Sequence, residues 1–177
     1  MRRFLDRLYY ASGALAAVCL ASICALMLAQ AFGREAGILI RGADDIVAWL
    51  NAACVFLALG HTFRHGELVR VGLFLDWLGP RPRWLAELFA LGFTALFVAY
   101  MMWAASRFVY ESWQFKEVAQ GLLRVPIWIP QMSFVVGVAI FLVAVLDELF
   151  VVLKKQKPAY QLAEESRRAA GDFSETL

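Results

Sequence analysis

The chain has 177 residues, of which 62% are hydrophobic and 18% charged, and its mean hydropathy is +0.64. A soluble domain of this size typically has about 45–50% apolar residues and about a quarter charged ones, and one small core cannot hold the excess. The net charge of +2 argues against a nucleic-acid partner, and the three cysteines, all within apolar runs, argue against a disulfide framework. The composition therefore predicts an integral membrane protein.

The first apolar run covers residues 9–32 and contains no charged residue. At about 1.5 Å per residue it reaches about 36 Å, enough to cross a hydrocarbon core of about 30 Å. A secretory signal is the alternative, but its apolar stretch is only about 7–15 residues long. Small side chains on this run permit close approach of a second helix: Ser12, Gly13, Ala16 and Ala17.

The second apolar run covers residues 46–63, with Asn51 and His61 as polar insertions. An amide inside a span, such as Gln30 or Asn51, typically hydrogen-bonds to a neighbouring helix. We expect His61 to be a helix-packing donor or an interface residue and not a metal or haem ligand.

The third run covers residues 84–105, with Glu87 near its start. No glycine or proline interrupts the chain between Gly92 and Gly121, so the helix is expected to continue to about Lys116. The extension carries an aromatic collar, which is either a membrane-surface anchor or a contact for an external partner. Its members are Phe108, Tyr110, Trp113 and Phe115.

The fourth run covers residues 127–153, with Asp147 and Glu148 close to its end. Pro126 and Pro130 are expected to open this helix, because proline in a first turn sacrifices little hydrogen bonding.

Continuous runs rich in Leu, Ala, Val and Phe, without alternation, indicate helices and not barrel strands. The sequence predicts an all-α membrane protein: a four-helix transmembrane domain at residues 1–153 and a cytoplasmic tail at residues 154–177. Twelve of the 17 Lys and Arg residues fall in the N-terminal segment, the second loop and the tail. The positive-inside rule then places both termini in the cytoplasm.

The second loop, residues 64–83, mixes apolar residues with Arg and Glu. This pattern predicts a short helix lying in the cytoplasmic interface and ending at Gly79-Pro80. The helix is either an ordinary amphipathic connector or a docking surface.

The middle of every predicted span lacks Asp, Glu, Lys and Arg. Intramembrane ionisable residues mark most proton and substrate pathways, so their absence argues against a proton-coupled pump acting alone. The only two histidines, His61 and His65, lie near one surface and do not provide bis-histidine haem ligation on facing helices. We therefore predict no catalytic residue, no cofactor and no metal site.

Three segments carry a resemblance to a known family. They are Gly60-His61-Thr62-Phe63-Arg64-His65-Gly66 with Leu68-Val69-Arg70-Val71, then Leu78-Gly79-Pro80-Arg81-Pro82-Arg83, and Val125-Pro126-Ile127-Trp128-Ile129-Pro130 with Gly137. In these segments the chain resembles the small membrane subunit (DctQ-type) of tripartite ATP-independent periplasmic (TRAP) transporters, over roughly residues 9–153. The family commonly has Trp and one or two Glu at the start of the second span, where this chain has Asp44-Asp45 and then Trp49.

The resemblance implies a multi-pass protein of the bacterial inner membrane. Its expected partners are a large permease subunit driven by a sodium gradient, a periplasmic solute-binding protein for an organic acid or similar solute, and membrane lipids. The implied role is to support the permease and to offer part of the periplasmic docking surface.

Aromatic and basic residues at the two membrane surfaces are the predicted partner contacts. On the cytoplasmic side these are Arg64, His65, Arg70, Trp77 and Trp84, and on the outer side Arg107, Tyr110, Trp113 and Lys116. Two other functions stay open on the sequence alone: a self-sufficient small oligomeric channel or carrier, and a membrane redox protein.

Overall fold

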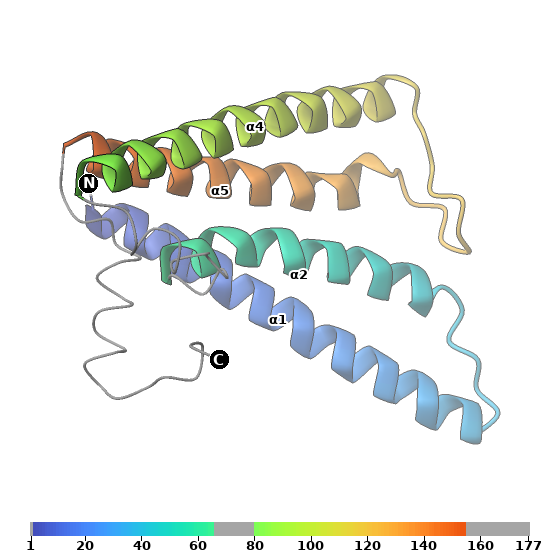
Figure 1. Cartoon of the computed structure of the whole chain (residues 1–177). Coiled ribbons are helices and arrows are strands. Elements are labelled where there is room, and N and C mark those ends of the chain that lie inside the picture. Colours follow the sequence, from blue (N-terminus) through green and yellow to red (C-terminus); the bar gives the residue numbers. More distant parts are fainter. Residues whose placement is uncertain (1, 66–79, 155–177) are drawn as a thin grey trace, which may run out of the picture.

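The computed structural model describes residues 2–65 and 80–154, with side chains from residue 5, and this part of the chain forms four long helices (Figure 1). They are α1 (Arg2–Glu35), α2 (Ala43–His65), α4 (Pro80–Gln114) and α5 (Trp128–Leu153). All four are long and apolar enough to cross a membrane, as the hydropathy predicted. The interfacial helix expected in the second loop falls at residues 66–79, outside the described residues.

Local sequence signals account for three of the helix ends. Asp44 and Asp45 lie in the first turn of α2, where carboxylates interact favourably with the helix dipole. The third helix continues to Gln114, close to the expected end near Lys116, and Lys116 itself adopts a left-handed φ of 52° that stops the helix. Pro130 lies in the first turn of α5, as expected, whereas Pro126 precedes the helix.

The helices stand side by side in a single row, in the order α1, α2, α5, α4 (Figure 1). The N-terminus, the start of α4 and the end of α5 share one end of the row, which we call the N-terminal end. The loops at residues 36–42 and 115–127 share the other end, which we call the loop end. Consequently α2 and α5 run parallel to each other, and each packs against an antiparallel outer neighbour.

Two glycines bring α2 and α5 close together. A Cβ placed on Gly137 would lie 2.6 Å from the backbone carbonyl oxygen of Phe56, and one on Gly60 would lie 2.8 Å from Cγ2 of Ile140. The helices therefore interlock at two levels, and at Gly137 the backbones themselves are in contact.

The small residues of α1 form its contact with α2. Ser12 and Ala16 are buried. A Cβ placed on Gly13 would lie only 2.9 Å from the nearest atoms of the His61 imidazole ring. Nδ1 of His61 is 3.2 Å from the carbonyl oxygen of Tyr9, so the tautomer with its proton on Nδ1 donates across the helix pair. The predicted packing role of His61 is confirmed.

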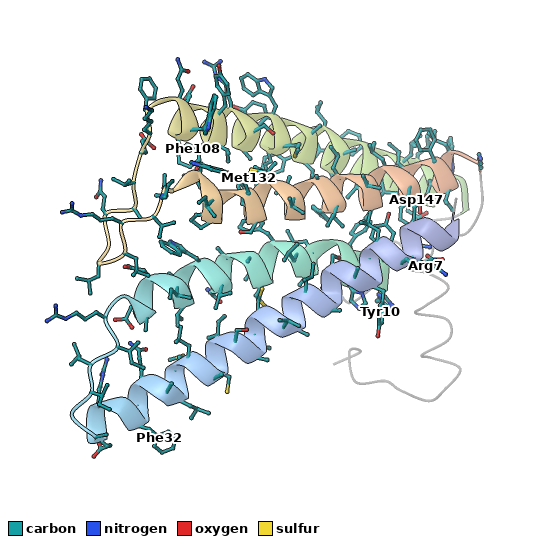
Figure 2. All side chains as sticks on the ribbon, turned by 180° about the vertical axis from the view of Figure 1, so that it is seen from behind. Arg7, Tyr10, Phe32, Phe108, Met132 and Asp147 are labelled. Carbon is teal, nitrogen blue, oxygen red and sulfur yellow. The ribbon has the colours of Figure 1, made fainter. Side chains whose placement is uncertain are left out.

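The largest cluster of buried apolar side chains joins all four helices towards the N-terminal end. Trp84, at the start of α4, packs against this cluster and donates its indole N–H to the carbonyl oxygen of Val152 at 3.0 Å. Figure 2 shows Arg7 and Asp147 at this same end, with Phe32 at the far end of α1. All four helices therefore meet in one apolar cluster near the N-terminal end.

Candidate interaction surfaces

Arg64 connects three helices at the N-terminal end. Its Nη2 lies 2.8 Å from Oδ1 of Asp6 on α1, and its Nη1 lies 2.8 Å from Oδ2 of Asp147 on α5. The guanidinium carbon is 5.2 Å from the centre of the Tyr9 ring. The planar fork of arginine can address two carboxylates at once, which the single ammonium of lysine does less well. We call these four side chains the Arg64 cluster.

Arg64, which the sequence predicted to contact a partner protein, forms two ion pairs within the chain. The side chain of Arg64 is 19% exposed and that of Asp147 is 23% exposed, so most of this ion pair is shielded from solvent by the helices. Sequence reasoning placed Asp147 near the same membrane surface as Arg64 but did not pair them. A partner contact through Arg64 stays a prediction.

The other predicted cytoplasmic residues lie at helix ends. His65 is exposed at the end of α2, with Nδ1 2.9 Å from the carbonyl oxygen of His61 and the two imidazole centres 4.1 Å apart. Trp84 opens the apolar part of α4 as predicted and is half-buried against α5. Arg70 and Trp77 lie outside the described residues.

The predicted outer residues gather at the loop end of α4. Arg107, Tyr110 and Trp113 are exposed on its last two turns, and the Tyr110 and Trp113 rings have centres 6.1 Å apart. Nε of Arg107 lies 3.2 Å from Oε1 of Glu111. Lys116 is exposed just beyond the helix. The structure therefore places the four together at one edge of the row.

A carboxylate of α2 holds the loop that joins α4 to α5. Oδ2 of Asp45 accepts a hydrogen bond from the backbone N–H of Leu123 at 3.2 Å. The same carboxylate occupies the space that a side chain at Gly121 would need, and Leu123 in turn packs on Gly42, whose φ is +80°. A side chain at either glycine would displace the loop from α2.

The loop has its own backbone bonds. Val118 and Pro126 form an antiparallel bridge, with the N–H of Ala119 donating to the carbonyl of Val125 at 2.9 Å. Ser112 donates to Oε2 of Glu117 at 2.9 Å, which fastens the loop to the last turn of α4. The loop is therefore a small hairpin seated on α2.

A hydrogen bond near the same point joins the two helices that flank the loop at residues 36–42. The side-chain amide of Gln30 on α1 donates to Oδ1 of Asp44 at 3.0 Å, which confirms the expected bond from Gln30 to a neighbouring helix. The two consecutive aspartates thus hold different elements, Asp44 the end of α1 and Asp45 the hairpin. The sequence analysis treated Asp44-Asp45 only as a departure from the family pattern. It did not identify Asp44 as the acceptor for Gln30, and it missed the contact of Asp45 with the hairpin.

We expect Asp45→Ala to loosen the hairpin without unfolding the helices. The N–H of Leu123 loses its acceptor, so amide exchange over residues 117–126 should accelerate by about ten-fold or more, since a hydrogen bond to a charged group contributes about 1.5–3 kcal/mol. Hydrogen–deuterium exchange with mass spectrometry of the protein in detergent measures this.

Asp44→Ala is the matched control, because it removes a neighbouring carboxylate that bonds Gln30 and not the hairpin. Equal exchange at residues 117–126 in the two variants would contradict the assignment.

Among the described residues, no three His, Cys, Asp or Glu side chains are grouped to hold a metal ion. The polar contacts between helices in the described part of the chain lie towards the two ends of the row. The helix segments between these ends are apolar. This arrangement defines a multi-pass helical membrane protein.

The family model "Tripartite ATP-independent periplasmic transporters, DctQ component" matches residues 23–155. The chain belongs to this family, which confirms the resemblance read from the sequence, and it is a transporter component and not an enzyme. The match covers α2, α4 and α5 entirely and α1 from residue 23 to its end. Searches of curated proteins and of solved structures gave no match.

Proposed function

We propose that this chain supports the large permease subunit of a TRAP transporter in the bacterial inner membrane and helps to dock the periplasmic solute-binding protein. The permease then moves an organic acid or similar solute on a sodium gradient. The family membership supports the tripartite setting, and the finer division of labour is our proposal.

The observation that carries the proposal is the charge distribution along the helices. No charged residue occurs between Arg7 and Arg34, between Asp45 and Arg64, or between Glu87 and Arg107. The fourth helix has none before Asp147. Helices without an ionisable residue at depth are suited to supporting a translocation pathway that another subunit lines.

The proposed orientation places the N-terminal end of the row in the cytoplasm and the loop end in the periplasm. The excess of Lys and Arg outside the two outer loops supports it. In this orientation Arg107, Tyr110, Trp113 and Lys116 face the periplasm, at the height where a soluble binding protein would dock. Arg64, His65, Arg70, Trp77 and Trp84 remain proposed contacts on the cytoplasmic side.

The test combines co-purification with reconstitution. This chain, tagged, is co-expressed with the permease and binding protein of the same transporter, extracted in mild detergent and reconstituted into liposomes with a sodium gradient. A labelled carboxylic acid that raises the melting temperature of the binding protein serves as the solute.

We expect the permease to co-purify and accumulation to require all three proteins. Accumulation by the isolated chain would instead identify a self-sufficient carrier. Full uptake by the permease and the binding protein without this chain would show that this chain does not support transport.

A further inference from the structure

One face of α4 carries large side chains at a regular spacing that no other described helix covers. Successive members are separated alternately by four and three residues, and each apolar member is between 58% and 76% exposed. We call them the α4 aromatic seam: Phe89, Phe93, Leu96, Tyr100, Trp103 and Tyr110, with Arg107 at the remaining position.

The opposite face of α4 has the same spacing, and this face packs against α5. Its buried side chains are separated by the same steps of four and three, or by their sum of seven, and they pack in the contact with α5. They are Leu91, Ala95, Val98, Ala105 and Val109. A repeat of 3.5 residues keeps one stripe facing a neighbouring helix crossed at about 20°, whereas contact with fluid lipid needs no fixed register.

The seam is also too long to be a set of lipid anchors. Phe93 lies about 14 Å along the axis from Trp84, within the hydrocarbon, and Tyr110 lies about 39 Å from it. The hydrocarbon is about 30 Å thick, and anchoring Trp and Tyr are confined to the headgroup level just beyond it. One continuous stripe that crosses the lipid and emerges from it fits a neighbouring protein helix.

Neighbouring side chains of the seam contact one another on the surface of α4. The rings of Phe89 and Phe93 have centres 6.4 Å apart, and those of Tyr100 and Trp103 have centres 5.9 Å apart. The guanidinium of Arg107 lies 5.9 Å from the centre of the Trp103 ring. Side chains already held in this way lose little rotamer freedom when a partner covers them.

The exposed area matches a stable interface. An aromatic side chain buries about 150–250 Å² when fully covered, so six large side chains at these exposures offer roughly 600–900 Å². A standard protein interface buries about 800 Å² on each partner.

We propose that the α4 aromatic seam is where a membrane-spanning helix of the large permease subunit packs. The partner stripe carries small residues such as Gly, Ala or Ser, because membrane helices approach closely through small side chains and bulky rings need space opposite them. The proposal rests on the proposed function, and it assigns the permease contact to α4 instead of α1.

Photo-crosslinking in membranes that contain the whole transporter tests the seam. A benzophenone amino acid replaces Phe93 or Tyr100 in the seam, or Leu20 as the control, which is 60% exposed on α1. We expect an adduct of this chain with the permease from both seam positions, at about ten times the yield from Leu20 or more.

A pair of truncations gives an independent readout. Phe93→Ala with Leu96→Ala should reduce the permease recovered with this chain about ten-fold, because a few large side chains carry most of the binding free energy of an interface. Leu20→Ala should leave recovery unchanged. Because the seam is exposed in the isolated chain, both variants should keep the melting temperature of that chain.

The outcomes separate the two proposals. A permease that co-purifies with the unaltered chain while the seam positions crosslink only lipid, or only a second copy of this chain, overturns the seam and leaves the proposed function standing. A permease that does not co-purify at all refutes both.

Discussion

Replacing Arg64 with alanine is expected to lower the free energy of unfolding by about 2–4 kcal/mol. The substitution leaves the carboxylate of Asp147 mostly shielded from solvent and without its cation, because its side chain is 23% exposed and the Arg64 distance is 2.8 Å. It also removes the pairing with Asp6 and the stacking on Tyr9, so the three helices lose one of the contacts that join them. Thermal unfolding in detergent micelles should show a midpoint lowered by roughly 5–10 °C.

Graded variants distinguish the ion pairs from simple loss of side-chain packing. Arg64→Lys keeps the charge but loses the fork, so it should lie between the native chain and Arg64→Ala. Asp147→Asn should cost more than Asp6→Asn, because the Asp6 side chain is 54% exposed and water screens it. An unchanged midpoint in Arg64→Ala would show that the cluster contributes nothing to stability.

The second large effect that we expect is a loss of stability when Gly137→Ala introduces one methyl group. Gly137→Ala places a Cβ 2.6 Å from backbone atoms of Phe56, and backbone yields less readily than a side chain. Helices α2 and α5 must then move apart along their whole contact. We expect a loss of about 1–3 kcal/mol, typical of an overpacked core, measured as the shift in the unfolding midpoint.

The chain supplies two controls for this experiment. A Cβ on Gly92 of α4 meets nothing within 4 Å, so Gly92→Ala should be neutral or stabilising by up to about 1 kcal/mol. Gly60→Ala should be milder than Gly137→Ala, because the atom nearest its new Cβ ends the Ile140 side chain, which can rotate. If all three variants unfold alike, the close approach of α2 and α5 is not what the methyl group disturbs.

Hydropathy alone was sufficient to predict four membrane-spanning helices, because each helix carries a continuous apolar run. The extension of α4 to Gln114 followed from the absence of glycine and proline, and the packing role of His61 followed from its place near the end of a span. Two of the family-like segments contain Gly60 and Gly137, the glycines at which α2 and α5 meet.

The order of the helices in the row could not be predicted from the sequence. Side chains that face lipid and side chains that face another helix are both apolar, so hydropathy does not distinguish the neighbours of a span. The Arg64 cluster was missed for a related reason, since Arg64 and Asp147 are 83 residues apart and only the parallel packing of α2 and α5 brings them together. The contact between Asp45 and Leu123 depends on the same packing.

The place of α5 in the row has a consequence for biosynthesis. Among the described helices, the last to leave the ribosome is α5, which lies between α2 and α4. Therefore α1 and α2 can pair as an early hairpin while α4 inserts without its neighbour. Until residues 128–153 emerge, α4 lacks the helix that it packs against in the folded chain. A nascent chain that stops short of Trp128 should therefore remain a substrate for membrane quality control.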